Sequence, residues 1–181
     1  MILAGAVVCT LCDHLHVAFG VLSYAHPDVW GQAWWVPLLF AVSTWSVIVG
    51  VVPARALFGA EPWRAPVSPA PIVFGGAMFV MAYAFTAFAP AGPNVIVGAL
   101  VLLWVLRVAK GVPRWLLGYS LIVAVAGPSV EATLSSLGLF SYRSPDLLGV
   151  PRWLPALYLH AGLVAGPVAA WVRESPRLVG S

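Results

Sequence analysis

A few ionisable side chains of this sequence stand inside otherwise apolar runs, and these are the groups that could do chemistry. They are Asp13, His14, His16, Glu131 and His160. A carboxyl or an imidazole in such surroundings can hydrogen-bond a hydroxyl or ester group, or transfer a proton. Two hydrogen-bonded carboxyls could in principle protonate a lipid alkene. The chemistry expected of these residues is therefore ligand binding or proton transfer in an apolar setting.

The stretch "CTLCDHLHV" (9–17) could also bind a metal ion. Cys9, Cys12 and His16 recur at helical spacing on one face. Their intervals differ from those of zinc sites, and no second cluster of Cys and His accompanies them. Two cysteines in an apolar run are more often small buried groups than ligands. We therefore expect no metal and no other cofactor.

The two carboxyls belong to an internal repeat. The stretch "GVLSYAHPDVWGQAWWVP" (20–37) agrees with "GLFSYRSPDLLGVPRWLP" (138–155) at eight of eighteen positions, and the same offset aligns Asp13 with Glu131. Repeated hairpins of equal orientation are related by rotation about the membrane normal. We expect Asp13 and Glu131 to approach one another and form the polar end of a lipid cavity, with His16 completing the set. The alternative is that the three side chains only fix helix packing.

The composition places these residues in a membrane. The chain has 181 residues, of which 61% are hydrophobic and only 8% are charged, whereas soluble domains are roughly 25% charged. The net charge of +3 is small and scattered, so we expect no nucleic-acid partner. No GxSxG, HExxH or glycine-rich phosphate loop occurs, and these absences favour a binding protein over an enzyme.

Six apolar segments are expected to position the site. A transmembrane helix needs about 20 apolar residues, because every backbone polar group must be paired internally. The expected spans are 2–23, 34–52, 71–88, 95–109, 115–140 and 153–172. We predict an all-α polytopic membrane protein, a single domain over 1–181, whose first and last hairpins are related. In the third span an aromatic and methionine-rich set that includes Phe74, Met78, Phe79 and Tyr83 would line an acyl-chain or sterol site, or simply face lipid. Gly75 and Gly76 would allow a neighbouring helix or a ligand to approach the backbone.

Two tracts resemble those of the Insig family of sterol-sensing membrane proteins. They are "AWWVP" (33–37) and "SYRSPDLLGVPRWLP" (141–155), of which the second is the more specific. The resemblance covers nearly the whole chain and implies a six-helix protein that binds an oxysterol-like lipid. It also places Phe74 near a sterol-contacting phenylalanine of the third span.

The sequence departs from the animal proteins where they bind the escort protein Scap. The family has an aspartate after a tryptophan pair at the end of the fourth span, and here "LLWVLRVAKG" brings Arg107 near that place. We therefore expect no Scap-type partner. The abundance of Ala, Gly, Pro, Val and Arg suggests a bacterial gene, hence a plasma-membrane location rather than the endoplasmic reticulum. In such a membrane a diacylglycerol-like lipid is a more available ligand than a sterol.

The function expected from these observations is that of an Insig-like lipid-binding protein, a sensor or regulator and not an enzyme. The alternatives are an intramembrane cyclase or hydratase that uses the buried carboxyls, and a small transporter suggested by the repeat. Small residues such as Gly162 and Gly166 could pack helices within one chain or between the chains of a homo-oligomer.

Basic residues indicate the orientation of the chain in the membrane. The side with both termini and the loop 53–70 carries seven of them, and the other side carries Arg143 and Arg152. Cytoplasmic loops are enriched in Lys and Arg. Both termini are therefore expected in the cytoplasm, with the repeated loops outside.

This orientation can be tested by thiol labelling. Single cysteines introduced as His26→Cys or Arg143→Cys, on a background lacking Cys9 and Cys12, should react with an impermeant reagent in intact cells. Arg64→Cys should react only after the membrane is permeabilised. Labelling of Arg64→Cys in intact cells would contradict the expected orientation.

Overall fold

The computed structural model describes residues 1–59 and 68–174. The helices are α1 (Ile2–Ala18), α2 (Val36–Val49), α3 (Val51–Phe58), α4 (Pro69–Phe88), α5 (Pro93–Val108), α6 (Arg114–Ser136) and α7 (Leu154–Glu174), and the strands are β1 (Leu22–Tyr24) and β2 (Phe140–Tyr142). The loop expected at 53–70 is shorter than predicted, because α3 extends to Phe58, and its residues 60–67 lie outside the described part.

Six helical units account for the seven helices, because Gly50 alone separates α2 from α3. The combined stretch Val36–Phe58, together with α4 and α6, is long and apolar enough to cross a membrane, while α1, α5 and Leu154–Val168 of α7 are shorter apolar helices. At the break, the Tyr119 hydroxyl donates a hydrogen bond to the Val47 carbonyl at 2.6 Å. A side chain that bonds into the backbone ladder is a recognised cause of helix breaks. The six-helix prediction is confirmed.

The first and fifth spans end earlier than predicted. α1 ends at Ala18 instead of residue 23, and α6 ends at Ser136 instead of residue 140. Gly20 and Gly138 follow these helices with φ of +63° and +73°, a left-handed conformation that stops a helix and that glycine adopts without strain. The chain then enters β1 or β2, which the sequence reasoning did not predict.

The two strands join the halves of the repeat. β1 and β2 pair antiparallel, with Leu22 opposite Tyr142, Ser23 opposite Ser141 and Tyr24 opposite Phe140. Ser23 therefore faces its own counterpart in the repeat, and the two hydroxyl oxygens lie 3.1 Å apart. This register is the one that a two-fold rotation between the repeats produces.

The loops that follow the strands contain the same turn twice. Trp30 and Gly31 have φ of +52° and +76°, and Leu148 and Gly149 have φ of +51° and +85°. Two consecutive residues of positive φ are typical of a type I′ turn. In both loops the residues that flank this pair also form an antiparallel bridge. The sequence repeat is therefore a structural repeat.

An aspartate stabilises each of these loops. The Asp28 carboxylate accepts a hydrogen bond from the Trp34 backbone at 3.0 Å, and Asp146 accepts one from the Arg152 backbone at 2.6 Å. The Arg152 side chain also pairs with Asp146 and donates to Asn94 at the start of α5. Desolvation alone would raise the pKa of Asp146, but the hydrogen bonds and charge of Arg152 hold that pKa below its usual range.

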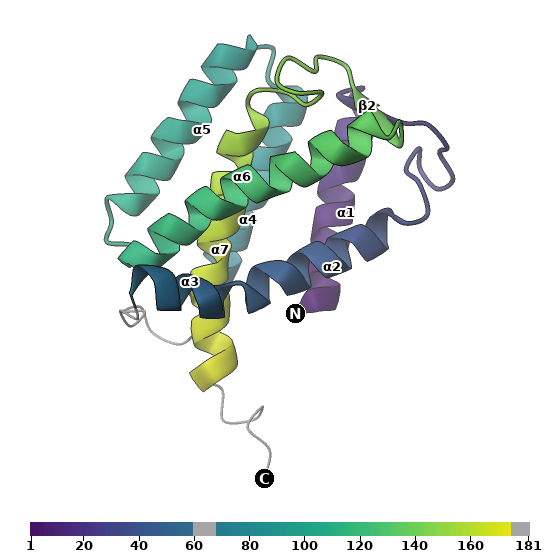
Figure 1. The fold of residues 1–181 in the computed structure, drawn as a ribbon. Coiled ribbons are helices and arrows are strands. Elements are labelled where there is room, and N and C mark those ends of the chain that lie inside the picture. The colour runs from purple at the N-terminus through teal and green to yellow at the C-terminus, as the bar shows by residue number, and fades with distance from the viewer. Residues whose placement is uncertain (60–67, 175–181) are drawn as a thin grey trace.

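Helix α7 is central to the bundle and contacts α2 to α6. The start of α1 and the last turns of α7 lie at one end of the molecule, while the strands lie at the opposite end (Figure 1). A close approach of α7 to α6 uses Gly162, one of the small residues noted in the sequence. A Cβ atom on Gly162 would lie 2.5 Å from the Ser120 Cα, so only glycine permits this packing. Gly162 therefore packs helices within the chain.

Candidate functional site

Asp13 is bound by side chains of its own repeat. The Tyr24 hydroxyl and the Gln32 amide both donate to its Oδ2 oxygen, at 2.8 Å and 2.6 Å. Asp13 is 5% exposed, so these donors replace the water that a carboxyl would otherwise bind. Tyr24 reaches it because α1 ends at Ala18 and β1 turns back over the last turns of the helix.

Glu131 is bound in a similar way in the second repeat. The Tyr142 hydroxyl donates to Oε2 and the Tyr158 hydroxyl donates to Oε1. Tyr142 is the counterpart of Tyr24 in the repeat, and it lies eleven residues after Glu131 as Tyr24 lies eleven after Asp13. Each repeat therefore supplies a strand tyrosine to its own carboxyl. The shared spacing of eleven residues was visible in the sequence. We did not use it, because we expected the two carboxyls to approach each other.

The carboxyls lie near the strand end of the bundle. Asp13 and Glu131 each precede the end of their helix by five residues, or about 7.5 Å. Within the described residues no hydrogen bond joins the two carboxyls, although they are close enough to interact electrostatically. Their approach is thus mediated by the paired strands and not by direct contact.

His16 is directed toward α4 and away from the carboxyls. Its Nε2 lies 2.8 Å from the Thr86 hydroxyl oxygen, and that hydroxyl donates its own hydrogen to the Tyr83 carbonyl at 2.7 Å. Nε2 must therefore carry the imidazole proton. The ring also lies against Tyr83, with centroids 4.2 Å apart, and meets the edge of Trp153 at 5.5 Å. His14 lies elsewhere, with Nδ1 3.1 Å from the Trp30 carbonyl oxygen.

His160 connects α5 to α7. Its Nε2 donates to the Leu100 carbonyl at 3.0 Å, so its Nδ1 accepts from the Arg107 guanidinium at 2.8 Å. Arg107 stands where the sequence comparison placed the aspartate of the animal Insig proteins. In this chain that position serves a contact between helices.

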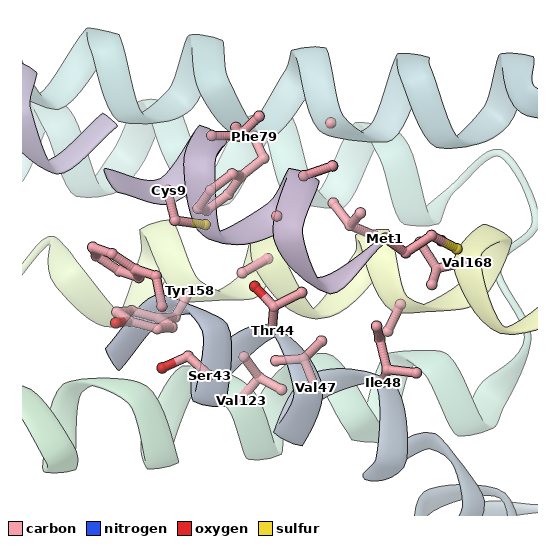
Figure 2. Close-up of a pocket in the computed structure, with 18 of the residues that line it drawn as sticks. Met1, Cys9, Ser43, Thr44, Val47, Ile48, Phe79, Val123, Tyr158 and Val168 are labelled. Carbon is pink, nitrogen blue, oxygen red and sulfur yellow. The ribbon is translucent and has the colours of Figure 1, made fainter. Parts of the chain in front are cut away.

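A cavity of about 320 Å³ lies among α1, α2, α4, α6 and α7. Its wall is apolar apart from Cys9, Ser43, Thr44, Tyr83 and Tyr158. Figure 2 shows Cys9 and Tyr158 toward one end, and Met1 and Val168 toward the other. Met1 is 48% exposed, so the cavity opens to the outside of the protein at the end where Met1 lies. We call the end with Cys9, Tyr83 and Tyr158 the inner end.

None of the five residues selected from the sequence as ligand contacts lines this cavity. Tyr158 separates Glu131 from the cavity, and Tyr83 separates His16 from it. On α4 the wall is formed by Ile72, Gly76, Phe79 and Tyr83. Phe74 is instead 57% exposed on the outside of the bundle, and Met78 does not line the cavity. The sequence had suggested Gly76, Phe79 and Tyr83 of the third span for a ligand site, and all three line the cavity. Tyr158 was missed, because no apolar periodicity distinguishes a cavity wall from a lipid-facing side.

No metal centre is apparent in residues 1–59 and 68–174, since no three His, Cys, Asp or Glu side chains gather closely enough to hold an ion. Cys9 and Cys12 are both free thiols. Cys12 is buried, whereas Cys9 contacts the cavity.

The fold and the cavity define a small polytopic helical membrane protein built on an internal repeat. No protein-family model matches the chain. It is 34% identical over 176 residues to the INSIG protein homolog of Mycolicibacterium vanbaalenii, across 91% of this chain and 81% of that protein. This chain therefore belongs to the Insig family.

Solved structures agree with that assignment. Two crystal structures of the mycobacterial Insig homolog MvINS match with TM-scores of 0.81 and 0.80 at 29% identity. Each match covers 97% of this chain and 94% of the other. One of the two is described as a cross-linked trimer.

The contacts of Glu131 generate a prediction for two variants. Glu131→Leu leaves the Tyr142 and Tyr158 hydroxyls without their acceptor, which costs about 1–3 kcal/mol in the free energy of unfolding; because Tyr158 also lines the cavity, we expect lipid retention to fall as well. Glu131→Gln keeps the shape and one acceptor oxygen, but its amide nitrogen can only donate, so one tyrosine hydroxyl has to reverse its role, and the loss should be smaller than in Glu131→Leu. Lipid retained by each purified, folded variant is measured by mass spectrometry. If Glu131→Leu and Asp13→Leu both leave retention unchanged, the carboxyls serve helix packing alone.

Proposed function

We propose that this protein binds a single sterol- or diacylglycerol-like lipid in the cavity and acts as a membrane lipid sensor or regulator, without catalysing a reaction. The observation that carries the proposal is an apolar cavity inside a membrane protein with hydroxyl groups at its inner end. Ligand sites have this character, since a large apolar wall binds the body and a few polar groups orient the head.

The size and the opening of the cavity support a lipid. Its volume of about 320 Å³ lies at the lower end of the range of ligand sites, roughly 300–1,000 Å³. It would hold a head group and the first part of an apolar body. The remainder would continue past Met1, which both lines the cavity and is 48% exposed. Such a ligand would keep its apolar part in contact with the bilayer.

The position of the carboxyls favours binding over catalysis. Asp13 is held by Tyr24 and Gln32, and it does not line the cavity. Glu131 reaches the cavity only through the Tyr158 hydroxyl. A cyclase or hydratase would need a carboxyl that can deliver its proton to a substrate carbon. Both carboxyls instead have the donors that a structural role requires.

We also propose the setting in which the protein acts. A bacterial relative and six apolar helices support a bacterial plasma-membrane location, with both termini cytoplasmic. The trimer described for MvINS supports a homo-oligomer here as well. Arg107 is engaged by His160, which supports the expectation that no Scap-type partner binds at this position.

A cavity-filling substitution tests the proposal. A Cβ atom on Gly76 would meet no atom within 4 Å, and Gly76 lines the cavity. Gly76→Leu should therefore fill the cavity without clashing and displace most of the co-purifying lipid. Gly98→Leu is the matched control, because a Cβ atom on Gly98 also meets no atom within 4 Å and α5 does not line the cavity.

The measurement is lipid extraction and mass spectrometry of each purified protein. Wild type and Gly98→Leu should carry a stoichiometric, unchanged lipid, and Gly76→Leu should carry much less. Equal retention by the two variants would place the lipid elsewhere. Conversion of added lipid to a product would support the enzyme alternative instead.

A further inference from the structure

We infer that Tyr83 and Tyr158 together make the inner end of the cavity selective for an uncharged lipid with a free hydroxyl group, against the same lipid with that hydroxyl esterified. This inference rests on the proposed function, because it assigns the specificity of the same cavity. Tyr83 is the donor to the ligand and Tyr158 is the acceptor from it.

Tyr158 can only accept a hydrogen bond from a ligand. A tyrosine hydroxyl has one hydrogen to donate and lone pairs that accept. The hydrogen of Tyr158 is directed to Glu131 Oε1 at 2.5 Å. The same residue lines the cavity, so a ligand group that reaches its oxygen meets only the lone pairs.

The orientation of Tyr158 is maintained by a second tyrosine. Glu131 accepts from Tyr142 through its other oxygen, Oε2. Tyr142 belongs to β2, whose pairing with β1 places it opposite Leu22. Rotating the Tyr158 hydroxyl toward a ligand would leave Oε1 without this donor, and an unsatisfied buried acceptor is costly. Tyr158 therefore stays an acceptor.

Tyr83 supplies the donor. Its side chain is only 7% exposed, yet its hydroxyl makes none of the hydrogen bonds found among the described residues. Its ring is fixed between His16, at 4.2 Å, and Phe79, at 5.8 Å. The hydroxyl oxygen is not among the fully buried polar atoms that lack a partner, so it remains accessible, and Tyr83 lines the cavity. A ligand oxygen in the cavity can therefore accept from it.

An alcohol complements this pair of groups. Tyr83 and Tyr158 line the same cavity. A ligand hydroxyl can accept from Tyr83 and donate to Tyr158 with the same oxygen. A ketone or an ester can accept from Tyr83 but offers no hydrogen to Tyr158, which leaves two acceptor oxygens facing each other.

Charged head groups fit the inner end poorly. Among residues 1–59 and 68–174, those that line the cavity include no Lys or Arg, so a phosphate would lack the cationic partner it needs in an apolar site. The side chain directly behind Tyr158 is Glu131, which offers no positive charge either.

The test compares two ligands that differ at one oxygen, 1,2-dioleoylglycerol and 1,2-dioleoyl-3-acetylglycerol. Delipidated full-length protein in detergent is titrated with each of them, in competition with a fluorescent diacylglycerol. Wild type should prefer the free alcohol about tenfold, the factor that matches one hydrogen bond lost from a buried site.

Two variants separate the roles of the tyrosines. Tyr158→Phe should lower affinity for the alcohol and bring the preference close to one. Tyr83→Phe should weaken both ligands by a similar factor and keep the preference, and it should fold, because Tyr83 has no side-chain hydrogen bond to lose. Tyr119→Phe is a control outside the cavity and should leave the preference unchanged.

The outcomes distinguish the inference from the proposed function. Equal binding of the alcohol and the acetate by wild type would overturn the inference while leaving the lipid site in place. Preference for the alcohol that survives in Tyr158→Phe would also overturn it. No binding of either ligand, and no displacement of the fluorescent lipid, would refute the proposed function itself.

Discussion

A carboxyl group within an apolar helix needs hydrogen-bond donors, and the structure of this protein is organised around that requirement. A charge at the centre of a bilayer costs at least ~2.5–3.5 kcal/mol. Asp13 and Glu131 meet the constraint with a tyrosine from the strand that follows their own helix. To bring that strand back, each helix has to end five residues after its carboxyl. The two returning strands then satisfy their backbone groups by pairing with each other, and this pairing joins the first and last parts of the chain.

The cavity depends on a departure from this symmetry. The offset that aligns Asp13 with Glu131 also aligns Phe40 with Tyr158, and both of these residues line the cavity. Only the second copy has a hydroxyl, which connects Glu131 to the cavity. Asp13 takes its second donor from Gln32, which aligns with an apolar valine in the other copy. The repeat therefore provides two matching carboxyl–tyrosine pairs. Different residues at matching positions give only Glu131 a polar contact with the cavity, through Tyr158.

The sequence was sufficient for the larger features, because they rest on strong and repeated signals. Apolar length identified the helices, and the offset between residues 20–37 and 138–155 identified the repeat. The strands were not predicted, because three residues are too few to show the alternation of apolar and polar side chains that marks a strand. Pairing between residues about 118 positions apart is a tertiary property as well. Gly20 and Gly138 were matched in the repeat, but nothing in their identity showed that they would end a helix.

The site was predictable only in its outer part. Asp13, His16 and Glu131 stood out because ionisable groups are rare in apolar runs, and the structure buries or half-buries all three. The sequence suggested Gly76 and Tyr83 only as members of an aromatic and small-residue set that could equally face lipid, and Tyr158 has a side chain that is common in membrane helices, so its type carried no signal. Their role follows from three-dimensional neighbours such as the His16 ring beside Tyr83. Phe74, selected by resemblance and composition, lies outside the cavity on the surface of the bundle.

The proposed lipid lies in the cavity with its head group at the inner end, and an experimental structure of the protein purified with its own lipid would test this position. We expect continuous density between Met1 and the inner end, with a ligand oxygen about 2.7 Å from the Tyr83 hydroxyl. An empty cavity, with lipid density only on the outer surface around Phe74, would contradict it.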